Sequence, residues 1–246
     1  MLAGKSVLIF GRYAANEVHA PDTRAGNEAM PQNPQHARPG FPGLTSPLPP
    51  PPAARPDAPW PVPSDEDCRR WWHEFDMLPH IRTHSLLVAE VAAFLARRGR
   101  ERGLAVEVQA VRASALLHDL AKTYTIRHSG NHSQLGAAWA MELTGNPLLA
   151  QGVMHHVSWP FELDIERYFL PLAVLYADKR VSHDRLVGMR ERFVDLMERY
   201  GRTSEIAARI RLTQAQALTI EAEFSRILGV DLNACAFDCR GLVERT

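Results

Sequence analysis

The sequence predicts an all-α protein preceded by a disordered, proline-rich tail, and three observations support this prediction. Thirteen of its 18 prolines lie between Pro31 and Pro63, and such a stretch can neither continue a helix nor bury a core. From Asp65 onward prolines are few, and apolar residues recur at intervals of three and four, the spacing of a helix with one buried face. This part of the sequence has no alternating pattern long enough for a useful strand and no internal repeat.

The length of 246 residues exceeds one typical domain and falls short of two. We therefore expect a tail over residues 1–64, a helical domain over residues 65–200, and a C-terminal helical extension over residues 201–246 that packs on the domain. The aromatic pair Trp71-Trp72 is expected to pack the first helix onto the others.

Composition and charge exclude several classes of protein. The formal net charge is zero, so no basic field favours nucleic acid or anionic lipid. No segment approaches the roughly 20 apolar residues of a membrane span. The short apolar run from Ser6 to Phe10 has neither the length nor the cleavage site of a secretory signal. We expect a cytoplasmic protein without a membrane or nucleic-acid partner.

The first two long helices of the body are expected over residues 79–98 and 106–122. The apolar face of the first contains His84 among residues such as Val88. The second becomes apolar before it reaches the doublet His118-Asp119, so the doublet is expected near the end of a buried helix. Two adjacent polar residues in such a place require an explanation.

The next helices are expected over residues 132–143, 147–157 and 170–181, and two longer amphipathic helices complete the chain. His132 falls in the first turn of one helix, which Gly145 and Asn146-Pro147 close. His156 shares one side of the following helix with apolar residues, and Asp178 follows an apolar run. The last helix repeats apolar residues from Ile206 to Ile227.

Six potential metal ligands are thus spread over otherwise apolar helices. They are His84, His118, Asp119, His132, His156 and Asp178. Burial of so many polar groups is costly unless something binds them, and a divalent cation is the simplest candidate. Imidazole and carboxylate together suit Mn, Fe, Co, Ni or Zn, and the lack of cysteine in the set argues against a structural site. Ligands from separate helices leave coordination positions open, as catalysis requires.

The surroundings of these residues resemble the HD-domain metal-dependent phosphohydrolases. The resemblance covers roughly Leu78 to Tyr200 and rests on three stretches. They are Ile81-Arg82-Thr83-His84-Ser85, Ala115-Leu116-Leu117-His118-Asp119-Leu120-Ala121-Lys122 and Tyr176-Ala177-Asp178-Lys179-Arg180. The resemblance implies an HD-domain helical bundle in which Asp119 anchors one metal or bridges two. His84, His118 and Asp178 would complete the first metal site.

Two further histidines look like those of family members that hold a second metal. His132 is followed by Gly136-Ala137, and His156 lies in Met154-His155-His156-Val157. The pattern is similar to that of bacterial hydrolases that split diadenosine tetraphosphate symmetrically, although Val157-Ser158-Trp159 replaces their Thr-rich turn. His156 rather than His155 is the expected ligand. The resemblance implies two divalent ions, with Fe or Mn expected and Mg, Co, Ni or Zn as alternatives.

The implied reaction is hydrolysis of a small-molecule phosphate or nucleotide by a metal-activated water. Lys122, expected at a helix C-terminus, would bind a phosphate as a point charge, and Arg82 and Lys179 are weaker candidates for the same role. Lys179 and Arg180 are expected to be solvated. A homodimer is left open.

Two other functions compete with this one. Some HD-type dinuclear iron proteins are oxygenases, and a mixed-valent iron spectrum would identify such an enzyme. An HD module without catalytic activity would instead bind a nucleotide or a partner as a sensor. The intact set of six ligands argues against the sensor.

Overall fold

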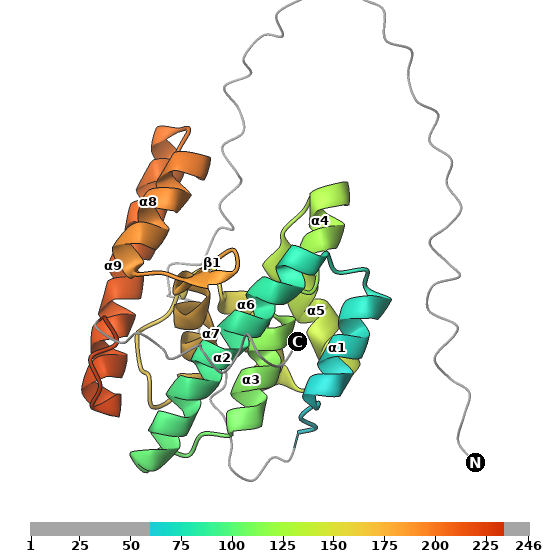
Figure 1. The fold of residues 1–246 in the computed structure, drawn as a ribbon, viewed down its shortest axis with the longest axis horizontal. Helices are drawn as coiled ribbons and strands as arrows, with labels where there is room; N and C mark the ends of the chain where they lie inside the picture. Colours follow the sequence, from blue (N-terminus) through green and yellow to red (C-terminus); the bar gives the residue numbers. More distant parts are fainter. Residues whose placement is uncertain (1–59, 234–246) are drawn as a thin grey trace, which may run out of the picture. The chain divides into compact units, whose positions relative to one another are not determined.

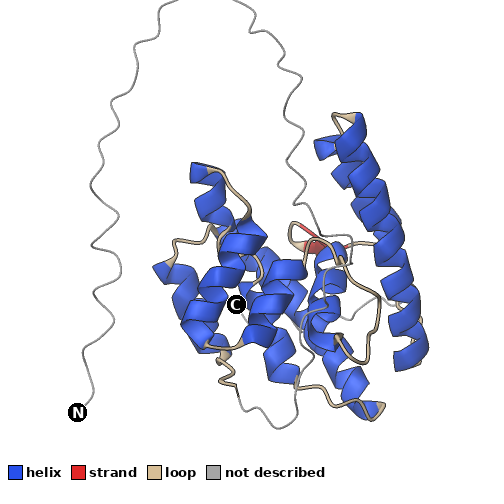
Figure 2. Cartoon of the chain, turned by 180° about the vertical axis from the view of Figure 1, so that it is seen from behind, coloured by secondary structure: helices blue, strands red, loops and turns tan. Residues whose placement is uncertain are grey.

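The computed structural model describes residues 60–233, and within them the predicted all-α fold is confirmed (Figures 1 and 2). The only strands among these residues are two short antiparallel strands of two residues each. The elements are α1 (Asp65–Glu74), α2 (Pro79–Glu101), α3 (Val108–Leu117), α4 (Lys122–His128), α5 (His132–Thr144), α6 (Pro147–His155), α7 (Phe169–Lys179), β1 (Val181–Ser182), β2 (Arg185–Leu186), α8 (Met189–Tyr200) and α9 (Ser204–Leu228). Most of the predicted tail, residues 1–59, and residues 234–246 of the predicted extension lie outside the described part.

Helices α2, α3, α6 and α7 form the centre of the bundle. α2 packs against α3 and α7, and α6 packs against α3, α5 and α7. Their facing side chains, such as Leu95, Leu116 and Leu172, are fully buried. Burial of one such side chain stabilises the fold by about 1.5–3 kcal/mol. This packing fixes the positions of the four helices from which most of the candidate ligands come.

Asparagine caps set where α5 and α6 begin. The side chain of Asn131 accepts from the backbone amides of Ser133 and Gln134. Asn146 does the same for α6, and Pro147 follows it at the first helical position. Such caps satisfy amides that have no partner within the helix, and they contribute about 1 kcal/mol each. The first cap holds His132 at the start of α5, as the sequence predicts.

The C-terminal helices α8 and α9 form a hairpin, which Figure 1 shows beside the central helices. α9 contacts α8, α7 and α2. Ile220 and Phe224 of α9 are fully buried against the bundle, and the ring of Phe224 meets Phe169 edge to face. The helix predicted from the apolar repeat between Ile206 and Ile227 is therefore confirmed.

The helix predicted over residues 106–122 is not continuous, which corrects the sequence-based expectation. α3 ends at Leu117, and the chain turns before α4 begins at Lys122. The amide of Leu120 bonds to the carbonyl of Leu117, and that of Lys122 to the carbonyl of Asp119, so both bonds span three residues instead of four. The indole nitrogen of Trp72 donates to the carbonyl of Leu116 at 2.9 Å, which satisfies an acceptor near the end of α3.

This interruption changes the position of Lys122, which begins a helix where the sequence predicts that it ends one.

None of the described helices has the length and apolar composition needed to cross a membrane.

Candidate metal centre

The structure brings all six predicted ligands into one group, in which every member except His132 is buried. α2 supplies His84, the turn after α3 supplies the His118-Asp119 doublet, and α5 supplies His132. His156 follows the last residue of α6, and Asp178 lies near the end of α7. The six residues come from positions up to 94 residues apart, yet each has a ligand atom within 4 Å of another.

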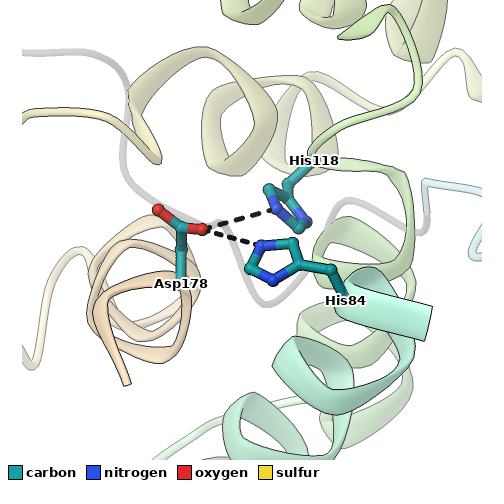
Figure 3. A group of neighbouring side chains, drawn as sticks. All are labelled: His84, His118 and Asp178. Carbon is teal, nitrogen blue, oxygen red and sulfur yellow. Dashed lines mark hydrogen bonds and ion pairs between the residues drawn. The ribbon is translucent and has the colours of Figure 1, made fainter. Parts of the chain in front are cut away.

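One set of ligand atoms gathers around Asp178 (Figure 3). Its Oδ1 lies 3.0 Å from Nε2 of His84 and 3.7 Å from Nε2 of His118. The three residues are buried, and their ligand atoms lie within 4.8 Å of one another. Oδ2 of Asp119 completes the surroundings, 3.4 Å from Nε2 of His118 and 3.9 Å from Nε2 of His84.

A second set gathers on the other oxygen of Asp119. Its Oδ1 lies 3.4 Å from Nε2 of His132 and 3.7 Å from Nε2 of His156. The two histidine Nε2 atoms are 3.1 Å apart. His118, Asp119 and His156 also offer ligand atoms within 4.8 Å of one another. Asp119 thus presents one oxygen to each set.

Backbone contacts orient two of the imidazole rings toward this group. Nδ1 of His118 lies 2.7 Å from the carbonyl of Ala115, and Nδ1 of His156 lies 2.7 Å from the carbonyl of Val153. A hydrogen on Nδ1 that donates to a carbonyl leaves Nε2 with a lone pair, which is how ligand histidines are usually held in metal sites.

Two atoms at the centre have no hydrogen-bond partner among the described residues. They are Nε2 of His118 and Oδ1 of Asp119, on side chains that are 0% and 1% exposed. A buried polar atom without a partner costs about 1–3 kcal/mol, so both atoms favour a ligand that accepts their lone pairs. A divalent cation meets this requirement, and the mixed nitrogen and oxygen donors suit a transition metal.

The protonation states also suit a cation. Burial lowers the pKa of His84 and His132, and it lowers that of His156 to about 3. Burial raises the pKa of both aspartates, but neighbouring positive charge outweighs it, and each pKa lies well below its ordinary value. The main neighbours are His118 and Lys122 for Asp119, and Lys179 for Asp178. Neutral imidazoles and ionised carboxylates are the forms that bind metal.

His118 differs from the other three histidines. Burial lowers the pKa of His118, but the charges of Asp119 and Asp178 raise it by more than burial lowers it, so the net shift is upward. A cation at this site would therefore compete with a proton for Nε2 of His118.

Two lysines contact the two carboxylates of the group. Nζ of Lys122 lies 2.7 Å from Oδ2 of Asp119, and its side chain is 39% exposed. Burial lowers the pKa of Lys122, but Asp119 and Asp178 raise it more, so the ammonium stays charged. Nζ of Lys179 donates to Oδ2 of Asp178 at 2.7 Å and to the carbonyl of His156 at 3.2 Å.

The expectation that Lys179 and Arg180 are solvated is wrong, because they are only 5% and 4% exposed. Sequence reasoning named Lys179 only as a weaker candidate for a phosphate contact and favoured a solvated side chain, so it missed the contact of Lys179 with Asp178. The signal was its place directly after a buried aspartate, where a lysine can neutralise the carboxylate at close range.

Arg82 is a predicted site residue that the structure places elsewhere. Its guanidinium donates to the carbonyls of Met77 and Trp72 and lies 3.0 Å from Nδ1 of His73. These contacts close the C-terminal end of α1. None of the contacts of Arg82 among the described residues reaches the six ligands.

The neighbouring histidines His155 and His156 have different surroundings. The His155 ring meets Trp159 and Phe161 edge to face, with centroids 5.3 and 5.4 Å away. The His156 ring lies 4.9 Å from that of His118. His156, not His155, therefore lies in the candidate metal centre, as the sequence predicts.

An open hollow of about 480 Å³ adjoins the second set of ligands. Its lining includes His132, whose side chain is 28% exposed, together with Asn131, His155 and Ser158. His132 thus connects the buried group to a space large enough for a small molecule.

Residues 81–210, slightly more than half of the chain, match a family model described as the HD domain. No curated protein and no solved structure matches the chain. The matched segment includes all six ligands and extends from α2 into α9.

Proposed function

The chain belongs to the HD domain family, and on this premise we propose that it is a metal-dependent phosphohydrolase. Its substrate would be a nucleotide-type compound, cleaved at a phosphoester or phosphoanhydride bond. The observation that carries the proposal is the position of Asp119, which presents one oxygen to each of two buried sets of ligands and has Oδ1 without a hydrogen-bond partner among the described residues.

The residues divide into two metal sites under this proposal. His84, His118 and Asp178 would hold one ion, His132 and His156 the other, and Asp119 would bridge them. Fe or Mn is the proposed metal. When bound, the ions supply an acidified water as nucleophile and offset charge on the phosphoryl oxygens.

Two lysines have separate tasks in this arrangement. Lys122 is partly exposed and lies beside Asp119, so its ammonium can meet a phosphoryl oxygen as a point charge. Lys179 is buried and bonds both to Asp178 and to the carbonyl of His156. It would hold α7 and the end of α6 at the spacing that the two sites need.

The finer proposal on the substrate follows the resemblance to hydrolases of diadenosine tetraphosphate. Its support is the pair of extra histidines, His132 and His156, whose Nε2 atoms lie 3.1 Å apart in the group. A nucleotide screen that includes dinucleoside polyphosphates tests it.

The deciding experiment compares the wild type with Asp119→Ala. Both are purified without oxygen, their metal content per chain is measured by elemental analysis, and both are screened against phosphate esters and anhydrides of nucleotides. We expect about two equivalents of iron or manganese in the wild type. In the variant, metal should be lost and kcat/KM should fall by more than about 100-fold, since replacement of residues that only support a metal ligand costs 10–100-fold.

Wild-type protein that stays inactive after reconstitution with iron or manganese would refute the proposal. A mixed-valent iron spectrum together with oxygen consumption would instead indicate that the protein is an oxygenase.

A further inference from the structure

Helices α3 and α6 approach each other closely at Gly152, a buried residue within α6. A Cβ atom at this position would overlap Oγ of Ser114 in α3 and lie 3.2 Å from the Cβ of Ser114. It would also lie 2.8 Å from Cδ2 of Leu170 in α7. Carbon atoms in contact lie about 3.5–4.0 Å apart, so a side chain at position 152 would push α6 away from α3.

The backbone of Gly152 gives no other reason for a glycine. Position 152 lies inside a helix, where glycine is a poorer helix former than alanine. The hydroxyl of Ser114, which occupies the space beside it, donates to the carbonyl of Leu149 at 2.9 Å. Leu149 lies three residues before Gly152 and therefore on the same face of α6. The close contact and the hydrogen bond together fix the spacing of α3 and α6.

This contact lies one helical turn before a candidate metal ligand on each helix. His118 follows Ser114 by four residues. His156 follows Gly152 by the same number. Both histidines keep right-handed helical backbone angles, so each lies on the same side of its helix as the contact. Their rings meet edge to face with centroids 4.9 Å apart. The spacing set at Gly152 is thus carried to the two histidines.

The two sets of ligands depend on α6 to different degrees. The set around Asp178 comes from α2, the end of α3 and α7, whereas His156 of the second set follows α6. Nδ1 of His156 lies 2.7 Å from the carbonyl of Val153, so its ring moves with that helix. Its Nε2 lies 3.7 Å from Oδ1 of Asp119. Displacement of α6 from α3 would therefore separate His156 from Asp119 and leave the first set in place.

We propose that Gly152 is a positioning residue for the second metal site. Because it has no side chain, α6 approaches α3 closely enough for His156 and Asp119 to bind one ion together. This inference rests on the two-ion arrangement of the proposed function and adds to it a residue that supplies no ligand atom. An alanine at position 152 should weaken the binding of the second ion and spare the first.

The test counts manganese ions on the full-length protein and measures their dissociation constants. Metal-stripped protein is titrated with Mn²⁺ in equilibrium dialysis, and bound manganese is measured by elemental analysis. We expect two ions per wild-type chain. Gly152→Ala should keep one ion with an unchanged Kd and raise the Kd of the other by about 10–100-fold, the cost of disturbing a group that orients a metal ligand. His156→Ala, which removes a ligand of the second site, identifies the ion concerned.

Gly99→Ala is the matched control, since it also adds a Cβ to a buried helical glycine in tight contact. That Cβ would lie 3.0 Å from the ring of Phe169, and position 99 is about 22 Å along α2 from His84. This variant should lower stability and leave both manganese affinities unchanged. A second ion weakened as strongly in Gly99→Ala as in Gly152→Ala would show a general loss of packing and overturn the proposal.

A double variant tests the contact itself. Ser114→Ala combined with Gly152→Ala removes the overlapping oxygen and leaves the Cβ of residue 114 at 3.2 Å from the new methyl group. It should raise the Kd of the second ion less than Gly152→Ala does and more than Ser114→Ala does, and it serves as the test if Gly152→Ala does not fold. Wild-type affinity for both ions in Gly152→Ala would overturn the proposal. So would a double variant that binds the second ion as tightly as Ser114→Ala.

The two proposals fail in different ways. Fewer than two ions on the wild type would refute the two-site arrangement and the positioning role with it. Gly152-dependent binding of the second ion by a protein that hydrolyses no phosphate would support the positioning role and refute the hydrolase. Hydrolysis by Gly152→Ala with both ions bound as tightly as in the wild type would refute the positioning role and support the hydrolase.

Discussion

Helix α7 carries two buried polar groups on opposite faces, and they differ in how their atoms are satisfied. One face presents Asp178 to the histidines of the candidate metal centre. The other presents Tyr176 and Arg180, which lie four residues apart and therefore on the same side of the helix. The hydroxyl of Tyr176 donates to Glu221 of α9 at 2.8 Å, and Nη1 of Arg180 donates to the Tyr176 oxygen and to the carbonyl of Leu232.

The two groups differ in whether the chain itself supplies hydrogen-bond partners for their buried polar atoms. Around Arg180, the chain itself supplies carboxylate, hydroxyl and carbonyl oxygens as partners. Around Asp119, one histidine nitrogen and one carboxylate oxygen have no hydrogen-bond partner within residues 60–233. Because unpaired buried atoms are costly, the first group is explained by stability alone, whereas the second requires a ligand from outside the chain.

The largest expected effect on stability comes from removing the carboxylate that pairs with Arg180. Glu221→Ala leaves the buried charge of Arg180 without its carboxylate and should lower the free energy of unfolding by about 3–5 kcal/mol. Urea unfolding measures this change. Glu223→Ala is the matched control, since it removes only an exposed ion pair with Arg226 and should change stability by less than about 1 kcal/mol. Equal stability of the two variants would contradict this view of the Arg180 group.

Metal should stabilise the protein only by binding at the candidate metal centre around Asp119. With free metal at 100 times its Kd, the wild type should gain about 2.7 kcal/mol, which is a rise in Tm of roughly 5–10 °C. Glu221→Ala should keep this gain despite its lower starting stability, and Asp119→Ala should lose it. Thermal unfolding with manganese and with a chelator measures the difference. An undiminished gain in Asp119→Ala would mean that the metal binds elsewhere.

The smallest expected effect is a pH dependence carried by His156 in metal-free protein. The pKa of this residue is about 3 in the folded chain and about 6.5 in the unfolded chain, so the unfolded state binds more protons between these values. Stability is therefore lost as pH falls below about 6.5, at about 1.4 kcal/mol per pH unit from this residue.

His156→Gln should reduce the slope of unfolding free energy against pH between pH 6 and 5 by about that amount. His128→Gln, which replaces an exposed histidine, should keep the wild-type slope. Identical slopes for the wild type and His156→Gln would show that His156 takes up its proton in the folded protein as readily as in the unfolded chain.

Residue pattern, together with the family resemblance, was sufficient to predict the helical body and the six candidate ligands that the fold brings together. Helical periodicity reports which face of each helix is buried, and polar residues such as His84 and Asp178 interrupt that face in a way the pattern makes visible. The caps at Asn131 and Asn146 act within four residues of the helix that they begin, so the starts of α5 and α6 could also be read from local sequence.

Only the tertiary structure decided the roles of the charged residues. Arg180 and Glu221 are 41 residues apart, and no local pattern shows that they meet in the core. Contacts with other elements likewise decide the positions of Lys179, which donates to the carbonyl of His156, and of Arg82, which is engaged at the end of α1. Near the break before Lys122, the partner of the Leu116 carbonyl is Trp72, 44 residues away in the sequence. A charge is solvated or buried according to the partners that the fold supplies, and those partners are distant in the sequence.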